Sequence, residues 1–154
     1  DLSSFSTGVF VDKEKMREHA EKIVEQFDIK TPSIDIPASK LSGGNLQKMI
    51  VGRELDRNPR VLIANQPTRG LDVGSIEYVR EVIMEQSEGG TGVLLISEDL
   101  NEVMDLSDRI IVMYEGEIVH ETPAESADFE TIGRYMTQGK QAEEAEDSAT
   151  EGVV

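Results

Sequence analysis

The chain has 154 residues, and its 31 acidic against 15 basic side chains give a formal net charge of −16. Such a surface repels phosphate backbones, so nucleic acid is not expected among its partners. No apolar run approaches the roughly 20 residues that a membrane-spanning helix needs, and the absence of cysteine excludes a disulfide framework or a thiolate metal site.

The first predicted element is a helix that begins after Asp12, whose carboxylate is placed to cap it. Apolar side chains then recur at the three- and four-residue spacing of one helix face, at Met16, Ala20, Ile23, Val24 and Phe27. Prolines at positions 32 and 37 indicate that a loop follows this helix.

A second helix is predicted directly after the run Leu-Ser-Gly-Gly-Asn at residues 41–45, and Asn58 with Pro59 marks its end. Its apolar side chains are expected to face inward, at Leu46, Met49, Ile50 and Leu55. The segment from the chain start to this point is therefore expected to be mostly helical.

Two short, continuous apolar runs, residues 61–64 and 93–96, are typical of strands that are covered on both faces. A helix with apolar residues at 76, 79, 82 and 83 lies between them and ends near Gly89 and Gly90. This alternation of strand and helix predicts an α/β core built on a parallel sheet.

After the second strand, the pattern predicts a short helix around Leu100, then a hairpin whose strands lie at residues 109–114 and 117–120. The turn of this hairpin is Glu115 and Gly116, and a last small helix is expected at Phe129 to Met136. Beyond Gly139 the residues are small and acidic, so disorder is expected there.

The run at residues 41–45 has the composition of an anion-binding helix start. Ser42, Gly43 and Gly44 precede or open the helix, where backbone N–H groups and the positive end of the helix dipole face outward. The two glycines allow an anion to approach the backbone closely, and the Ser42 hydroxyl can donate to a phosphate oxygen. Taken alone, such a run is more typical of an ordinary loop and cap.

Four segments nevertheless occur in an informative order: LSGGNLQK at 41–48, the apolar strand at 61–64, NQPTRGLD at 65–72, and SED at 97–99. In this order they resemble the signature motif, Walker B strand, D-loop and switch region of an ABC-type ATPase, from about Thr7 to about Glu121. More narrowly, LSGGNLQK and QPTRGLDVG resemble the second ATPase domain of the double-domain subunits that drive sugar and nucleoside importers.

The resemblance implies an α/β fold that is the C-terminal portion of a P-loop NTPase ABC ATPase domain, with a helical subdomain and a parallel-sheet core but no P-loop strand. We expect residues 1–58 to form the helical signature subdomain and residues 59–122 to form the core portion with Walker B, D-loop and switch region. Residues 123–138 would form a small C-terminal helix, and residues 139–154 an acidic disordered tail.

Three positions of the chain's own nucleotide site depart from the family pattern. Asn65 and Gln66 stand where the family has the Asp that holds Mg²⁺ and the Glu that acts as general base, and Glu98 replaces the switch histidine. An amide lacks the charge that Mg²⁺ prefers and cannot usefully accept a proton from water, and a carboxylate beside the γ-phosphate adds repulsion. The resemblance thus implies a degenerate site, although Asn65 and Gln66 could also simply end a strand and cap a loop.

No G-x-x-x-x-G-K-[ST] motif occurs in the chain, and Lys48 lies inside the second helix, one turn too late to serve as the phosphate-loop lysine. The phosphate loop is expected upstream of Asp1 in a longer parent protein. This chain alone is therefore expected to bind ATP poorly, and ATP and Mg²⁺ would be shared with a partner domain.

In the family, two ATPase domains pair head to tail, and each signature motif closes over the nucleotide of the other. Ser42, Gly43, Gly44 and Asn45 are intact enough for that role, although Asn45 replaces the commoner Gln, and Asp72 of the D-loop would lie at the seam. The implied partners are a second ABC ATPase domain, on the same parent polypeptide, and membrane permease subunits. The implied location is the cytoplasmic face of the cell membrane.

Two other functions remain open at this stage. A soluble ABC-type ATPase that acts on ribosomes or DNA would usually carry basic surfaces or coiled-coil insertions, which this chain lacks. A purely structural half-domain would not require Ser42 or its glycines. The acidity itself fits either ordinary solubility or a salt-rich cytoplasm, in which ions screen the charges.

Overall fold

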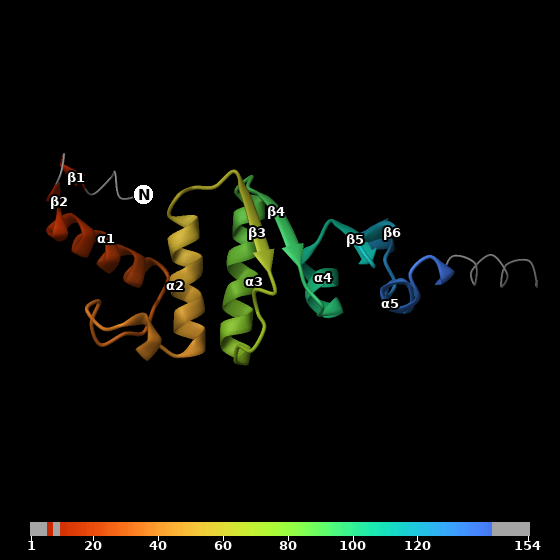
Figure 1. The fold of residues 1–154 in the computed structure, drawn as a ribbon, viewed down its shortest axis with the longest axis horizontal. Coiled ribbons are helices and arrows are strands. Elements are labelled where there is room, and N and C mark those ends of the chain that lie inside the picture. Colours follow the sequence, from red (N-terminus) through yellow and green to blue (C-terminus); the bar gives the residue numbers. More distant parts are fainter. Residues whose placement is uncertain (1–5, 8–9, 143–154) are drawn as a thin grey trace, which may run out of the picture. The chain divides into compact units, whose positions relative to one another are not determined.

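The computed structural model describes residues 6–7 and 10–142, and Figure 1 labels their helices and strands in chain order. The chain forms two units, each taken over its described residues. The first comprises Asp1–Leu62 with Pro67–Leu94, and the second comprises Ile63–Gln66 with Leu95–Val154.

The first unit begins with two very short antiparallel strands, β1 (Ser6–Thr7) and β2 (Phe10–Val11), which the sequence did not predict because two residues carry no periodicity. Helix α1 (Lys13–Gln26) follows. Its predicted cap is confirmed, since the Asp12 carboxylate accepts the backbone N–H groups of Glu14 and Lys15, both at 3.1 Å.

A single turn of 3₁₀ helix, η2 (Ala38–Lys40), leads into helix α2 (Gly43–Leu55), which contacts α1. The inward position predicted for Ile50 is wrong, because this side chain is 36% exposed. Leu55 is buried as predicted, and the other buried residues of α2 are Gly44 and Gly52. A Cβ added at Gly52 would lie 2.7 Å from the ring of Phe27, so α2 can lie this close to Phe27 because position 52 has no side chain.

The hydrophobic core of the first unit gathers residues from the helices and the turn after α1: Phe27, Ile29, Leu55 and Val82. Val82 belongs to helix α3 (Val73–Glu88), which the sequence predicted. Leu62 and Tyr78 pack against this cluster, together with other partly buried apolar residues. The core therefore joins all three long helices of the unit.

Strands β3 (Val61–Asn65) and β4 (Gly92–Ile96) are neighbours in a two-stranded sheet. They begin together, where the Gly92 N–H donates to the Arg60 carbonyl, and end together, where the Gln66 N–H donates to the Ile96 carbonyl. The prediction that both faces are covered is wrong for the described chain, since Val61 and Ile63 are each 64% exposed. Alternate residues point to opposite faces of a strand, and the described residues cover only one of them.

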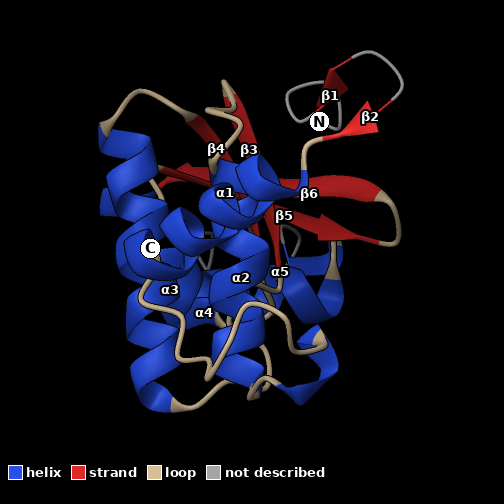
Figure 2. Ribbon diagram, turned by 90° about the vertical axis from the view of Figure 1, so that its left-hand side faces the viewer, coloured by secondary structure: helices blue, strands red, loops and turns tan. Residues whose placement is uncertain are grey.

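The second unit contains helix α4 (Leu100–Leu106), strands β5 (Arg109–Tyr114) and β6 (Glu117–Pro123), a 3₁₀ turn η3 (Ala124–Ser126) and helix α5 (Phe129–Gln138). The predicted hairpin is confirmed and longer than expected. Its turn residues Glu115 and Gly116 have φ values of 49° and 84°, as a type I′ turn requires. Figure 2 shows the hairpin strands, against which α5 packs.

The core of the second unit is formed by buried residues from β5, α5 and the segment after α5: Ile110, Val112, Ile132, Tyr135 and Ala142. Ala142 is fully buried, so the predicted disorder is wrong at residues 140–142. After the left-handed Gly139, the chain turns back and places this small apolar side chain against the core. Residues 143–154 of the predicted disordered tail lie outside the described residues.

Within the part of the chain that the structure describes, none of the helices combines the length and the apolar character required to cross a bilayer.

Candidate functional site

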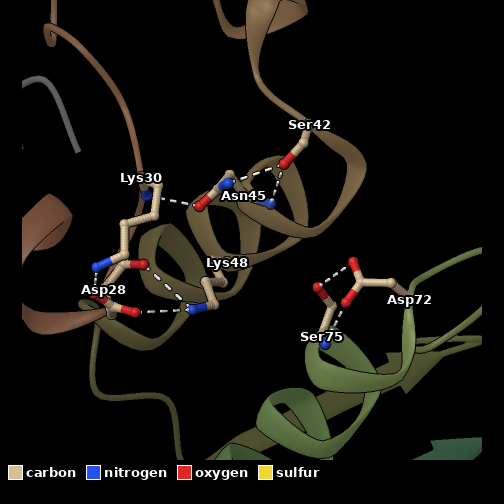
Figure 3. A network of polar contacts seen from close by, with 7 residues as sticks. All are labelled: Asp28, Lys30, Ser42, Asn45, Lys48, Asp72 and Ser75. Atoms are coloured by element: carbon tan, nitrogen blue, oxygen red, sulfur yellow. Dashed lines mark hydrogen bonds and ion pairs between the residues drawn. The ribbon is translucent and has the colours of Figure 1, made fainter.

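Ser42 is the N-cap of α2. Its hydroxyl is held in place by Asn45 (Figure 3). Its Oγ accepts the side-chain Nδ2–H of Asn45 at 2.9 Å and the backbone N–H of Asn45 at 3.4 Å. A serine oxygen has two acceptor lone pairs and one donor hydrogen. With both lone pairs occupied, the Ser42 hydrogen is left to be donated away from the helix, as anion binding requires.

The orientation of the Asn45 amide follows from its second partner. The backbone N–H of Lys30 lies 2.6 Å from Asn45 Oδ1, and an N–H group can only donate. The amide oxygen must therefore face Lys30, which leaves the amide nitrogen to face Ser42. Asn45 thus ties the helix start to the loop after α1 and sets the direction in which the Ser42 hydroxyl donates.

The two glycines after Ser42 differ in their surroundings. A Cβ added at Gly43 would meet nothing within 4 Å, so its backbone is open to an approaching ligand. Gly44 is buried, and a Cβ there would lie 2.1 Å from Ser75 Oγ and 3.1 Å from Ser75 Cβ. Gly43 fits the predicted close approach of an anion, whereas the absent side chain of Gly44 makes room for Ser75.

Asp72 lies beside this contact as the N-cap of α3. Its carboxylate accepts the backbone N–H of Ser75 at 3.0 Å and the Ser75 hydroxyl at 2.8 Å. The hydroxyl bond is the main reason that the pKa of Asp72 is lowered, followed by the backbone bond. Asp72 is therefore a charged, exposed carboxylate at the start of the helix.

Lys48 is committed to structural contacts. Its Nζ lies 3.2 Å from the Asp28 carbonyl, 3.3 Å from Asp28 Oδ2 and 4.3 Å from the centroid of the Tyr78 ring. Its side chain is only 16% exposed. The pKa of Asp28 is lowered by Lys30 first and by Lys48 second. These contacts agree with the expectation that Lys48 does not serve as a phosphate-binding lysine.

One further contact, not predicted from the sequence, joins α2 to the loop after β3. The Gln47 side-chain nitrogen donates to the Pro67 carbonyl at 2.9 Å. Gln47 belongs to the LSGGNLQK run, and Pro67 directly follows Gln66. Only a fold-level pairing of these segments could reveal the bond, since twenty residues separate the two partners.

In the second unit, Asn65 and Gln66 lie at the carboxyl end of β3, and Glu98 follows the end of β4. Gln66 has a φ of 48°, and its N–H donates to the Ile96 carbonyl at 2.8 Å. The left-handed conformation costs a non-glycine residue roughly 1–2 kcal/mol, and this bond helps to hold it. Asn65 and Glu98 are exposed, so both can meet a ligand.

The comparisons with known proteins bear on this arrangement. The chain is 56% identical over 140 residues to the glucose import ATP-binding protein TsgD13 of Haloferax volcanii, a match that covers 90% of this chain and 26% of that protein. It is 46% identical over 131 residues to the guanosine import ATP-binding protein NupO of Bacillus subtilis, covering 85% of this chain and 26% of that protein. The chain is a homologue of the ABC-type ATPases.

Solved structures of ATP-binding cassettes also match this chain. The ADP conformation of MJ1267, an ATP-binding cassette of an ABC transporter, matches with a TM-score of 0.62 and 28% identity, over 90% of this chain and 52% of that one. The dimeric MJ0796 cassette bound to ADP and Pi matches with a TM-score of 0.63 and 26% identity, over 80% of this chain and 53% of that one. No family model matches the chain.

These matches confirm the predicted family resemblance and fold class. The chain spans about a quarter of the length of the curated relatives and about half of each solved cassette, which is consistent with the C-terminal portion of a cassette. The run that begins at Leu41 is called the signature motif below, after the family motif that it resembles. In the same sense, β3 is called the Walker B strand, and the loop that ends at Asp72 is called the D-loop.

The two units carry different donor sets. The signature motif offers an outward hydroxyl at Ser42 and an open backbone at Gly43, which suit phosphate oxygens. The end of the Walker B strand offers the neutral amides of Asn65 and Gln66, so Mg²⁺ would find oxygen ligands there without their usual charge. The residues fit phosphate well and fit Mg²⁺ weakly.

Proposed function

We propose that this chain is part of the ATP-binding, energy-coupling subunit of an ABC importer for nucleosides or simple sugars. The curated relatives support this, since their names describe import of glucose, guanosine, nucleosides and ribose. The membrane permease subunits would be partners of the complete protein at the cytoplasmic face of the membrane. A second ATPase domain, on the same polypeptide, would complete its nucleotide sites.

The observation that carries the proposal is the fixed hydroxyl of Ser42. Asn45 occupies both of its lone pairs, so the Ser42 hydrogen is ready to be donated before any ligand arrives. Donors that are held in place in advance stabilise developing phosphate charge without reorganisation. In the proposed function, Ser42 and the Gly43 backbone contact the phosphates of ATP held by the partner domain.

The chain's own site is proposed to be slow. Asn65 would orient a hydrated Mg²⁺ through its amide oxygen, and Gln66 would hydrogen-bond the attacking water without accepting its proton. When bound, Mg²⁺ would neutralise charge on the phosphoryl oxygens. Glu98 would face those oxygens as a like charge, which disfavours the transition state. This site therefore retains nucleotide while the partner's site performs most of the turnover.

Reconstitution of the full-length protein with its permease subunits in lipid vesicles tests the transport role. We expect ATP hydrolysis to rise when a nucleoside or a simple sugar is supplied together with its binding protein. Substitution of the solute by an amino acid serves as the control and should leave the rate at its basal value. Hydrolysis that is unaffected by the permease subunits and by every solute would contradict the proposal.

Asn45→Asp tests the role of Ser42 as a donor. A carboxylate at this position still accepts from Lys30 but cannot donate, so the Ser42 hydroxyl would turn to donate to it. We expect ATP turnover of the full-length protein to fall by about tenfold or more. Because the new charge also repels phosphate, the substitution is repeated in Ser42→Ala. There, the loss should shrink markedly, and an equal loss in both backgrounds would rule out an effect through Ser42.

A further inference from the structure

Three residues, Gly44, Ser75 and Asp72, join the signature motif to the D-loop within the first unit. Ser75 lies in the first turn of α3, where its hydroxyl donates to Asp72 at 2.8 Å and its N–H donates to the same carboxylate at 3.0 Å. The same hydroxyl oxygen would lie 2.1 Å from a Cβ at Gly44. One serine thus both binds the D-loop carboxylate (Figure 3) and fills the space left by a signature glycine.

A Cβ at Gly44 would disturb this contact. Ser75 Oγ would have to move, since separations below 3.0 Å essentially never occur for real Cβ atoms. The hydroxyl can rotate away only by breaking its bond to Asp72. Ser75 Cβ would still lie 3.1 Å and Asp72 Oδ2 3.3 Å from the added Cβ, so both neighbours would have to give by a few tenths of an ångström.

From this geometry we propose that Ser75 is a positioning residue, which fixes the start of the signature helix and the D-loop carboxylate in one arrangement. The inference rests on the proposed function, in which Ser42 and Asp72 both face the partner domain. It adds that these two groups do not move independently, because Gly44, Ser75 and Asp72 connect their helices. A shift of either element would then be transmitted to the other.

Gly44→Ala in the full-length protein tests the contact, with the Ser75 side chain shortened in parallel. We expect Gly44→Ala to lower the thermal unfolding midpoint and to reduce ATP turnover by about tenfold. Ser75→Gly in the same chain should restore most of the unfolding midpoint, since it removes the two atoms nearest to the new Cβ. Turnover should recover only to the level of Ser75→Gly alone, because the hydroxyl bond to Asp72 is still missing. Ser75→Ala should restore less, because its Cβ remains 3.1 Å away. Gly133→Ala is the matched control, since its Cβ meets nothing within 4 Å.

Ser75→Ala alone separates positioning from packing. It keeps the helix start, because Asp72 still accepts the Ser75 backbone N–H, but it loses the hydroxyl bond. We expect the unfolding midpoint to stay close to that of the unsubstituted protein while ATP turnover falls about threefold or more. Turnover that changes only in proportion to the midpoint would overturn the positioning role. If Ser75→Gly does not restore the unfolding midpoint of the Gly44→Ala variant, the contact between Gly44 and Ser75 is itself overturned.

Comparison of Ser42→Arg with Gly44→Ala distinguishes a failure of the role of Ser75 from a failure of the proposed function. A loss of turnover in Ser42→Arg together with unchanged turnover in Gly44→Ala would retain the signature role and overturn the role of Ser75. Unchanged turnover in Ser42→Arg would instead overturn the proposed function. In that case, recovery of the unfolding midpoint by Ser75→Gly would still support the contact between Gly44 and Ser75.

Discussion

Ser42→Arg is expected to reduce steady-state ATP hydrolysis by the full-length protein by at least about a hundredfold. The hydroxyl that Asn45 directs outward would be replaced by a long side chain that fills the space in front of Gly43, where a Cβ would meet nothing within 4 Å. The guanidinium would occupy the position proposed for the partner's phosphates. The measurement is turnover at saturating ATP, together with the unfolding midpoint.

Two further variants serve as a control and as a milder substitution. Ser126→Arg makes the same chemical change at an exposed serine in the second unit and should leave turnover unchanged. Ser42→Ala removes only the donor and should give an intermediate rate. If Ser42→Arg hydrolysed ATP at the unsubstituted rate, the signature motif of this chain would have no part in hydrolysis.

Asn65→Asp combined with Gln66→Glu is expected to activate the chain's own site. The first substitution supplies the charge that Mg²⁺ prefers, and the second supplies a base that can accept the proton of water. General bases contribute on the order of a hundredfold or more. The gain is best measured in the Ser42→Arg background, where the partner's site is silent and any restored hydrolysis belongs to this chain's site.

The matched control adds the same two charges elsewhere, through Asn58→Asp and Gln138→Glu at exposed positions. It should restore nothing. Glu98 remains in the activated variant, so the expected rate is below that of an intact site, and Glu98→His should raise it further. An activated variant that is as slow as Ser42→Arg would show that Asn65 and Gln66 do not limit this site.

Local chemistry made much of the fold predictable. Asp12 caps α1 through its own carboxylate, and Glu115 with Gly116 forms the hairpin turn, because both features depend on adjacent residues. Packing between distant segments was less accessible. Ile50 has the spacing of a core residue, but the interior position belongs to Gly52, which lets α2 approach the ring of Phe27. Ala142 was assigned to the tail by its acidic neighbours, yet it completes a core built by remote strands.

The same distinction applies to the site. The order of segments located Ser42 at a helix start and Asp72 in the loop before the next long helix, and the structure shows that both are N-caps. Sequence spacing could not show that the Lys30 backbone orients Asn45, because that bond crosses fifteen positions. It also assigned both signature glycines one role, whereas the structure gives Gly44 a different neighbour from Gly43. Such roles depend on which surfaces meet, and composition alone does not specify them.

The fit between Gly44 and Ser75 restricts how this chain can diverge. A methyl group at position 44 and a hydroxymethyl group at position 75 cannot be present together unless the Ser75 hydroxyl turns away and gives up its bond to Asp72. Whether a substitution at position 44 is tolerated therefore depends on the residue at position 75. Loss of the serine side chain at position 75 has to come before a side chain is gained at position 44. Among descendants of a common ancestor, alanine at position 44 should be found beside glycine at position 75, and seldom beside serine.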